Sequence, residues 1–279
     1  MDFTHRLLWP GGFTVLMAVY KNDNPFLFRN AIESVLANTL LPNQFIIVID
    51  GPISSELNTV IRDFSSSSII KIDFISLPHN IGLASALNKA IPFIKFPWVV
   101  RADSDDINLP HRFLSQAKFI IDNPNIDLFG SQILELNNNN MVQKNKYVPL
   151  SQPDIFKFLK FRNPFNHMTI CIKLNVLILS GGYPNIYLRE DYGLWSIVLS
   201  LTQNVANMKD ILVHVNSIDL VSRRGGIKYA FGELDLQKLL ISTRHISFLN
   251  GLANLIRRFL FFILPLKLRT FIYNNFLRS

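Results

Sequence analysis

Three carboxylates lie within four positions, directly after a short apolar run. The run covers residues 98–102, and Asp103, Asp105 and Asp106 follow it. Carboxylates held this close repel one another, so their clustering favours a hard divalent cation with oxygen ligands. Residues two apart on an extended segment point the same way, which makes Asp103 and Asp105 the predicted metal ligands and turns Asp106 elsewhere. An ordinary acidic surface turn is the alternative.

Acidic residues at two other places are candidates for polar chemistry. Asp50 ends a predicted strand before a Gly-Pro turn, and on the rim of a parallel sheet it would lie beside Asp103. Glu190 and Asp191 precede an apolar helix, where one of them could act as a general base toward an acceptor hydroxyl. Asp50 could equally be a turn residue, and acids at a helix N-terminus are ordinary partners of the helix dipole.

Two segments have the composition of phosphate-binding loops. Asn80-Ile81-Gly82, followed by Asn88, places a glycine and two amides where a loop opens a helix, and backbone N–H groups there favour phosphate. The segment lacks the lysine and further glycines of a P-loop. Arg223 and Arg224 precede two glycines, a basic turn that could close over a diphosphate. Helix capping and an ordinary surface loop are the alternatives.

Histidine and cysteine give weaker signals. His167 lies among polar, turn-forming residues and is a candidate substrate or metal contact, ahead of His214 in a strand-like run. Cys171 is the single cysteine, which rules out an intramolecular disulfide, and its apolar neighbours predict a buried strand position.

The elements that must position these residues alternate between strands and helices. Strands are predicted at 13–20, 45–50, 69–77 and 98–102, the third apolar enough to be largely buried, with helices at 24–38, 54–64 and 82–93 between them. Asn24 and Pro25 supply a cap and a first-turn proline. The second half is mixed, with helices at 110–122 and from 154 and 190, a hairpin of 127–135 with 141–148, and a strand near 169–172. Such an order predicts an α/β fold with a mostly parallel sheet.

Composition is that of a globular domain with a basic appendage. The chain has 279 residues, 49% hydrophobic, and a net charge of +8. The last acidic residue is Asp235, and seven basic residues follow it. The body is therefore nearly neutral, whereas the C-terminal tail is cationic.

Taken in order, five segments resemble family 2 glycosyltransferases of GT-A fold. They are Val15-Leu16-Met17-Ala18-Val19-Tyr20, Asp50-Gly51, Asn80-Ile81-Gly82-Leu83, Arg101-Ala102-Asp103-Ser104-Asp105-Asp106 and Glu190-Asp191. The resemblance covers roughly residues 12–225. It implies a GT-A catalytic domain over 1–225, with a nucleotide-sugar half at about 12–106 and an acceptor half at about 107–225, followed by a basic amphipathic helical extension over 226–279.

The resemblance also implies roles for individual residues. Asp103 and Asp105 match the family's DXD pair, which binds Mn²⁺ or Mg²⁺ and the donor diphosphate, and Asp191, beside Glu190, matches the catalytic base. The residues expected at the donor nucleotide are Val19, Tyr20, Asp50, Asn80, Gly82, Arg101 and Asp103. Further contacts to substrate or diphosphate are expected from His167, Arg223 and Arg224. In-line attack then inverts the anomeric centre.

Within that family, the segments at 163–169, 181–183 and 223–226 resemble bacterial enzymes that build O-antigen or capsular repeat units. This subfamily resemblance implies transfer of glucose, galactose or an N-acetyl form from a UDP-sugar to a sugar linked to undecaprenyl diphosphate. A catalytically inert sugar-nucleotide-binding or scaffold protein is one alternative, against which both acidic motifs argue. A nucleotidyltransferase is another, but residues 20–24 offer no glycine for its phosphate loop.

The tail predicts contact with a membrane surface. Residues 249–278 interleave bulky apolar side chains with arginine and lysine, and their longest apolar run, broken by Pro265, is far shorter than the roughly 20 residues of a transmembrane helix. We therefore expect an interfacial element on an anionic leaflet, rather than nucleic-acid binding. The alternative is a helical pair that packs on the catalytic domain. The N-terminus shows no signal peptide, which predicts a cytoplasmic protein at the inner face of the membrane.

Overall fold

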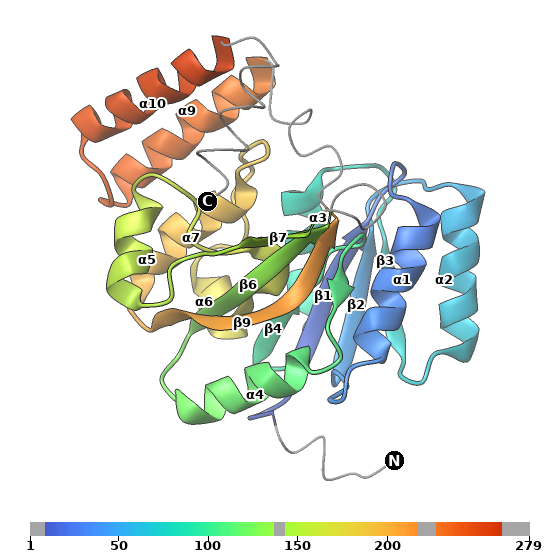
Figure 1. Cartoon of the computed structure of the whole chain (residues 1–279). Helices are drawn as coiled ribbons and strands as arrows, with labels where there is room; N and C mark the ends of the chain where they lie inside the picture. The colour runs from blue at the N-terminus through green and yellow to red at the C-terminus, as the bar shows by residue number, and fades with distance from the viewer. Residues whose placement is uncertain (1–8, 137–142, 217–226, 264–279) are drawn as a thin grey trace.

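A mixed sheet with helices on both faces forms the molecule, and nine strands are found in the part of the chain that the structure describes (Figure 1). This computed structural model describes residues 9–136, 143–216 and 227–263. The strand order is β3-β2-β1-β4-β8-β6-β9-β5, with β7 paired to β6. β3, β2, β1 and β4 are parallel, and β8 runs antiparallel to β4. The α/β class and the mixed, mostly parallel sheet predicted from the sequence are confirmed.

The first half builds the parallel part of the sheet in βα order. Its elements are β1 (Phe13–Val19), α1 (Pro25–Leu36), β2 (Gln44–Ile49), α2 (Ser55–Ser67), β3 (Ile72–Ser76), α3 (Leu83–Ala90) and β4 (Trp98–Arg101). Asn24 caps α1 as predicted, since its side chain accepts hydrogen bonds from the N–H groups of Phe26 and Leu27. The third strand is shorter and less buried than predicted, because β3 is the edge strand and pairs only with β2.

The second half adds strands with mixed pairing, in which β6 and β9 are parallel and the other pairs are antiparallel, together with the remaining α-helices. Its elements are β5 (Ile107–Asn108), α4 (Arg112–Asp122), β6 (Leu128–Leu136), β7 (Gln143–Lys146), α5 (Gln152–Leu159), β8 (Cys171–Lys173), α6 (Leu174–Leu179), α7 (Glu190–Leu201), β9 (Val205–Asn216), α9 (Ile227–Ser242) and α10 (Phe248–Ile263). β6 and β7 form the predicted hairpin, whose asparagine connection lies outside the described residues. Cys171 is buried in β8, as expected.

Alternating side chains of the strands build one core on each face of the sheet. Along β1, Val15 and Met17 pack with α1, α2 and α4, whereas Leu16 and Ala18 face α3, α6, α7 and α9. This alternation makes a three-layer sandwich of helices, sheet and helices. It also brings the ends of the parallel strands to one rim, where the polar residues lie.

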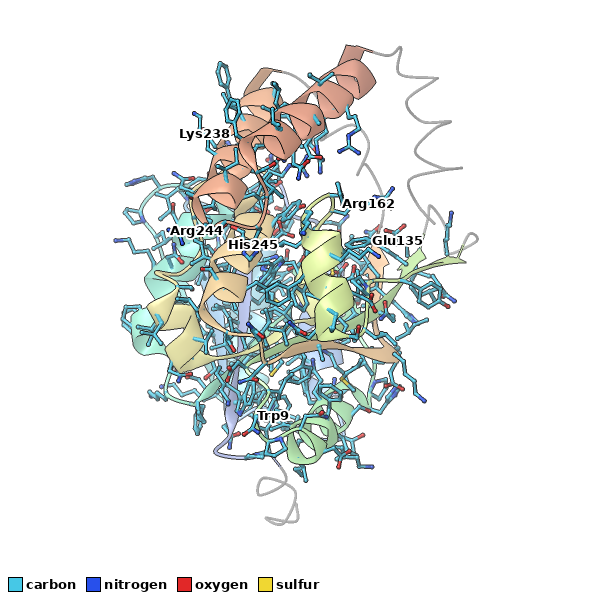
Figure 2. All side chains as sticks on the ribbon, turned by 90° about the vertical axis from the view of Figure 1, so that its left-hand side faces the viewer. Trp9, Glu135, Arg162, Lys238, Arg244 and His245 are labelled. Carbon is cyan, nitrogen blue, oxygen red and sulfur yellow. The ribbon has the colours of Figure 1, made fainter. Side chains whose placement is uncertain are left out.

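The C-terminal helices α9 and α10 lie side by side as a pair, next to α7 and α5 (Figure 1). Figure 2 shows Lys238 of this pair at the opposite end of the molecule from Trp9. Leu236 and Leu240 of α9 belong to the core that contains α7, so the pair packs on the half of the chain that follows β4. α10 is amphipathic, with Asn254 buried and Leu249, Leu252 and Ile256 exposed. No helix within the described ranges is both long and apolar enough to span a bilayer.

Candidate functional site

Three carboxylates converge where β4 ends. Oxygen atoms of Asp103, Asp105 and Asp106 all lie within 4.8 Å of one another. The prediction that Asp106 points elsewhere is wrong, because the chain is extended only to Ala102 and turns at residues 104–105. Asp106 is 2% exposed, and its Oδ1 accepts a hydrogen bond of 3.1 Å from the N–H of Asn216. The cluster therefore contains three aspartates, one of them deeply buried.

The electrostatics of the cluster fit a divalent cation. Burial raises the pKa of Asp106 well above its ordinary range, and the charges of Asp105 and Asp103 raise it further. The second oxygen of Asp106, Oδ2, is buried and has no hydrogen-bond partner. An oxygen-only donor set with an unpartnered buried oxygen suits Mn²⁺ or Mg²⁺. Within the described ranges, this is the one group of three or more such ligands.

Two buried arginines hold one carboxylate of the cluster and the backbone just before it. Arg101 is 2% exposed and its Nη2 lies 2.7 Å from Oδ1 of Asp103. Arg112 donates from Nη2 to the carbonyl of Arg101 at 2.8 Å, and burial lowers its pKa to about 9, so it remains charged at neutral pH. Arg101 thus orients a predicted metal ligand, and its expected role at the nucleotide stays a prediction.

Asp50 fills the loop that was expected to bind phosphate. Its carboxylate accepts hydrogen bonds from Asn80 Nδ2 at 2.8 Å and from the N–H groups of Ile81 and Gly82 at 2.8 and 3.0 Å. The N–H groups of Ile81 and Gly82 thus already bind a carboxylate of the chain itself, which favours the structural alternative over phosphate binding, and contact of this loop with the donor stays a prediction. Gly51 has a φ of +85°, and a Cβ there would meet the backbone N of Asn80 at 2.4 Å.

Asp23, in the loop after β1, binds the turn that carries Asp103, Asp105 and Asp106, which we call the acidic turn. Its Oδ2 accepts hydrogen bonds from Ser104 Oγ at 2.9 Å and from the N–H of Tyr20 at 3.1 Å. Val19 and Tyr20 therefore lie on the same rim as Asp103, as the parallel pairing of β1 with β2 and β4 requires. The sequence did not single out Asp23 or Ser104.

A tyrosine and a histidine connect the acidic turn to α7. His167 is buried and its Nε2 lies 3.0 Å from the hydroxyl of Tyr183. Burial lowers the pKa of His167, so the neutral ring is favoured. Asn88, predicted beside the phosphate loop, instead fixes the turn before Tyr183 by bonding both the N–H and the carbonyl of that residue at 2.8 Å.

The second acidic pair opens α7. Asp191 accepts hydrogen bonds at Oδ2 from Asn163 Nδ2 at 2.5 Å and at Oδ1 from the N–H of Tyr192 at 2.7 Å. Burial, and then the charge of Asp191, raise the pKa of Glu190 to about 7. The pair thus provides one hydrogen-bonded carboxylate and one carboxyl group that titrates near neutrality, as a general base requires.

Charges from both acidic clusters reach the same buried side chains. The charges of Asp103, Asp191 and Glu190 all act on the buried Tyr183 and raise the pKa of its hydroxyl, after burial. Asp103 and Asp191 also both act on His167. Asn163 bonds Asp191, and Tyr183 is affected by the charges of both clusters, yet the sequence named neither as a functional residue. Their sequence signal is their presence in the segments 163–169 and 181–183, which resemble bacterial repeat-unit enzymes but indicate no role for either side chain.

Other predicted residues lie apart or outside the description. His214 pairs with Ile107 across β9 and β5, and the oxygen cluster of the three aspartates does not include it. Arg223 and Arg224 lie outside the described residues.

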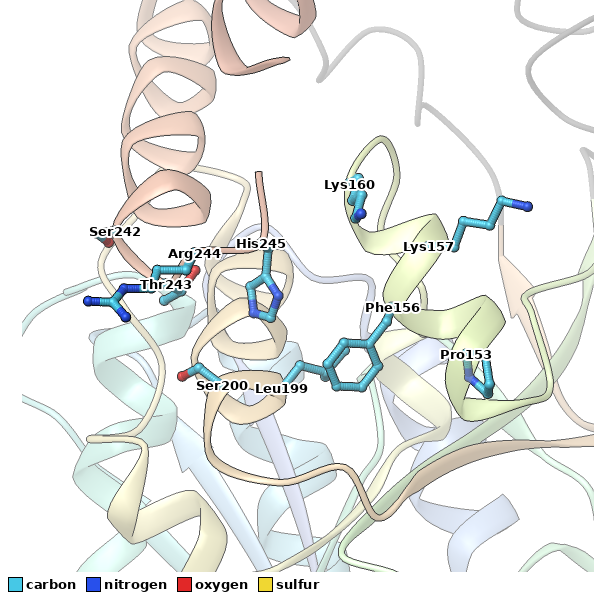
Figure 3. A pocket seen from close by; sticks show the side chains of 10 residues that line it. All are labelled: Pro153, Phe156, Lys157, Lys160, Leu199, Ser200, Ser242, Thr243, Arg244 and His245. Atoms are coloured by element: carbon cyan, nitrogen blue, oxygen red, sulfur yellow. The ribbon is translucent and has the colours of Figure 1, made fainter. Parts of the chain in front are cut away.

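A basic groove lies between α5, the end of α7 and the turn that joins α9 to α10. Its volume is about 760 Å³. Phe156 and His245 face each other in it, with ring centroids 6.0 Å apart, and Lys157, Lys160 and Arg244 lie along its edge (Figure 3). Leu199 and Ser200, which line it, are at the opposite end of α7 from Glu190. The groove is thus separate from the acidic site.

The fold and the joined acidic clusters define a GT-A glycosyltransferase, an enzyme class that generally uses a divalent metal. The chain belongs to the family described as Glycosyl transferase family 2, which matches residues 14–182. Membership in this family displaces the inert-scaffold and nucleotidyltransferase alternatives.

Known relatives match nearly the whole chain. An Escherichia coli protein named UDP-Gal:alpha-D-GlcNAc-diphosphoundecaprenol beta-1,3-galactosyltransferase is 37% identical, over 95% of this chain and 96% of its own length. The amylovoran biosynthesis glycosyltransferase AmsE of Erwinia amylovora is 31% identical, over 94% of this chain and 98% of its own. The crystal structure of S. aureus TarS 1–349 has a TM-score of 0.66 at 14% identity, covering 95% of this chain and 75% of that one, and it supports the fold alone.

Proposed function

We propose that this protein transfers a hexose from a UDP-sugar to a sugar carried on undecaprenyl diphosphate, with inversion at the anomeric carbon. The hexose is glucose, galactose or an N-acetyl form, and the name of the E. coli relative makes UDP-galactose the first donor to test. One observation carries the proposal: Asp103 of the three-aspartate cluster and both members of the Glu190–Asp191 pair lie close enough to the buried Tyr183 for their charges to raise the pKa of its hydroxyl. A donor diphosphate at the first cluster and an acceptor hydroxyl at the second would therefore meet in one site.

The three aspartates would hold the divalent metal, for which we propose Mn²⁺ or Mg²⁺. When bound, the cation neutralises the negative charge that develops on the departing diphosphate. The chain contributes the orientation of the ligands: Arg101 holds Asp103, and the N–H of Asn216 holds Asp106. Val19, Tyr20, Asp50 and the Asn80–Gly82 loop, which lie on the same rim, would contact the nucleoside.

The acceptor proton would pass to the acidic pair of α7. Asn163 and the N–H of Tyr192 fix the carboxylate of Asp191, so one of its lone pairs can receive the proton of the attacking hydroxyl. The acceptor oxygen then bonds to C1 of the donor sugar as the bond from C1 to the diphosphate oxygen breaks. UDP leaves with both electrons of that bond, so the balance needs no further reactant. Asp191 is the base that we propose, with Glu190 as the titrating neighbour.

A donor panel tests this proposal directly. UDP release is measured from UDP-glucose, UDP-galactose and their N-acetyl forms, with Mn²⁺ or EDTA, using a GlcNAc- or GalNAc-diphosphate-lipid as acceptor. We expect release with one donor that requires both acceptor and metal. Folded protein that gives no acceptor-stimulated release with any of these donors would contradict the proposed substrates.

We also propose that the C-terminal part binds an anionic membrane surface from the cytoplasmic side, where a lipid-linked acceptor is presented. Leu249 and Phe248 are 74% and 70% exposed, and with Leu252 and Ile256 they form an apolar face on α10. Lys157, Lys160 and Arg244 line the groove beside the turn that leads into this helix. Exposed apolar side chains beside uncompensated basic ones are what an anionic leaflet attracts. The remainder of the predicted segment, 264–278, lies outside the described residues.

Sedimentation with vesicles separates this surface from an ordinary exposed face. The full chain is mixed with phosphatidylcholine vesicles, with and without phosphatidylglycerol, at low and high salt. We expect binding that needs the anionic lipid, weakens with salt and is lost in Leu249→Asp. The matched control is Ile121→Asp on α4, since Ile121 is also exposed but lies on the other face of the sheet. Equal binding by both variants would contradict the assignment of the surface to α10.

A further inference from the structure

The segment before the proposed base is held in an unfavourable backbone conformation. Leu188 has a φ of +54°, a region that side-chain-bearing residues seldom occupy. Such a conformation persists only when surrounding contacts impose it. The segment Tyr187–Arg189 leads directly into Glu190 and Asp191, so whatever imposes this conformation also sets where the acidic pair lies.

Residues of one face of α9 supply those contacts. A Cβ at Gly232 would meet the carbonyl oxygen of Tyr187 at 2.4 Å, so the helix approaches the segment as closely as a glycine permits. One turn earlier, the Tyr229 hydroxyl accepts a hydrogen bond of 2.6 Å from Arg189, whose guanidinium lies 4.6 Å from the centre of the Tyr229 ring. α9 thus packs on the segment through its backbone and through a side chain.

A buried glutamate adjoins these contacts. Glu233 is 1% exposed, and its Oε2 lies 2.8 Å from Arg189 Nη2, while its Oε1 lies 2.9 Å from Nε of Arg258 on α10. Gln237 donates a further hydrogen bond of 2.8 Å to Oε1. A carboxylate this buried requires such partners, and removing it leaves two guanidinium groups without their counter-charge.

Arg258 extends the network to the other side of Asp191. Its Nη2 donates to the carbonyl of Phe161 at 3.0 Å, and Asn254, one turn earlier on α10, donates to the carbonyl of Lys160 at 2.9 Å. These carbonyls lie two and three residues before Asn163, which bonds Asp191. The helical pair therefore holds both segments that fix the proposed base.

From this arrangement we infer that Glu233 and Arg258 are positioning residues for the base. Through Arg189 they fix the start of α7, and through Phe161 they fix the segment that carries Asn163. The C-terminal helices then complete the acceptor half of the active site in addition to any role at a membrane. This inference rests on the proposed function, because it assumes that Asp191 accepts the acceptor proton.

The test is Glu233→Gln in the full-length protein, with Asp235→Asn as the matched control on the exposed side of the same helix, where Asp235 pairs with Lys238. Steady-state UDP release is measured across pH, and the affinity for UDP with Mn²⁺ is measured by calorimetry. For Glu233→Gln we expect kcat to fall about 10- to 100-fold, as misplacement of a reacting group does, with a shifted pH profile and unchanged affinity for UDP. Asp235→Asn should match the parent protein in all three.

The outcomes separate the inference from the function on which it rests. If the parent protein transfers no sugar, the proposed function fails. If the parent transfers sugar and folded Glu233→Gln keeps its kcat and pH profile, the inference is overturned, even where the variant melts at lower temperature.

Should Glu233→Gln fail to fold, Arg258→Lys replaces it, because lysine keeps the charge but cannot bond Glu233 and the Phe161 carbonyl in the same fork geometry. A smaller fall in kcat in the same direction supports the inference, and a parent-like kcat overturns it.

Discussion

The two acidic clusters are positioned in different ways. The three aspartates of the proposed donor cluster lie close together in sequence just after β4, so the strand end brings them to the rim, where Arg101 and the N–H of Asn216 orient two of them. Asp191 depends on side chains far away in the chain, since Asn163 holds it directly and Glu233 holds the segment before it through Arg189. The proposed donor side is therefore placed mainly by sheet topology, whereas the proposed acceptor side is placed mainly by tertiary side-chain contacts.

This difference bears on how the two sides would tolerate change. A parallel sheet whose strand-end backbone pairs with neighbouring strands keeps its rim in place when one side chain is altered. A segment held by a buried ion network loses its geometry when one member is removed. A substitution among the three aspartates should then remove only the function of the altered side chain. A substitution in the Glu233 network should instead displace Asp191, although it does not touch that residue.

The largest effect is expected for Asp103→Asn. The change keeps the shape but removes a charged metal ligand, and losses of one such ligand in an electrostatically stabilised site reach about 100- to 1,000-fold in kcat. Acceptor-stimulated UDP release with added Mn²⁺ measures it, and circular dichroism checks that the fold persists. Near-parent turnover would remove Asp103 from the metal site.

Asp191→Asn should come next, with a fall in kcat of about 100-fold or more, the range for loss of a general base. Affinity for UDP should not change, since Asp191 lies on the acceptor side. Calorimetry with UDP and Mn²⁺ checks that separation. A variant with parent-like kcat would assign the proton transfer to another group, of which Glu190 is the first candidate.

Glu190→Gln tests the titrating member of the pair. Because burial raises the pKa of Glu190 to about 7, its carboxylate forms only above that pH, and kcat should rise with pH through this region in the parent protein. The kcat of the variant should be roughly tenfold lower than that of the parent at pH 8, and it should not rise with pH through this region. A rise near pH 7 that persists in Glu190→Gln would belong to another group.

The same pKa has a consequence for stability. The folded protein holds the Glu190 proton more tightly than the unfolded chain between pH 4.5, the ordinary value, and about 7, so this group stabilises the fold less as pH rises through that window. Chemical denaturation at both ends of this pH window should show that the free energy of unfolding falls with rising pH in the parent protein and not in Glu190→Gln.

What the sequence could and could not predict follows the same division. The parallel strands, the Asn24 cap and the start of α7 at Glu190 depend on local pattern, and they were predicted correctly. The direction of Asp106 was missed because a turn replaces the extended geometry at residues 104–105. For the Asn80 loop, the sequence left phosphate binding and helix capping open, because no local pattern reveals that Asp50, 31 residues before Ile81, accepts hydrogen bonds from its N–H groups.

The Glu233 network did leave a weak signal in the sequence. Tyr229, Glu233, Leu236 and Leu240 share one face of a helix by their spacing, which places an acid in line with core residues. An acid in that position requires a partner, but the identity of Arg189 and Arg258 as the partners depends on how the helices pack. Spacing alone could therefore indicate a buried charge and could not indicate what it holds in place.

The smallest effect is expected for Ser104→Ala on the donor side. Ser104 is 8% exposed and donates to Asp23, which ties the acidic turn to the loop after β1. Losing one such hydrogen bond should lower the free energy of unfolding by about 1–2 kcal/mol, since the acceptor is charged. KM for the donor should rise only a few-fold and kcat should stay near the parent value, because the strands still set the rim. Ser55→Ala, at an exposed position, is the matched control. A fall in kcat as large as that of Glu233→Gln would show that the donor side, too, depends on side-chain contacts, and the contrast between the two halves would be wrong.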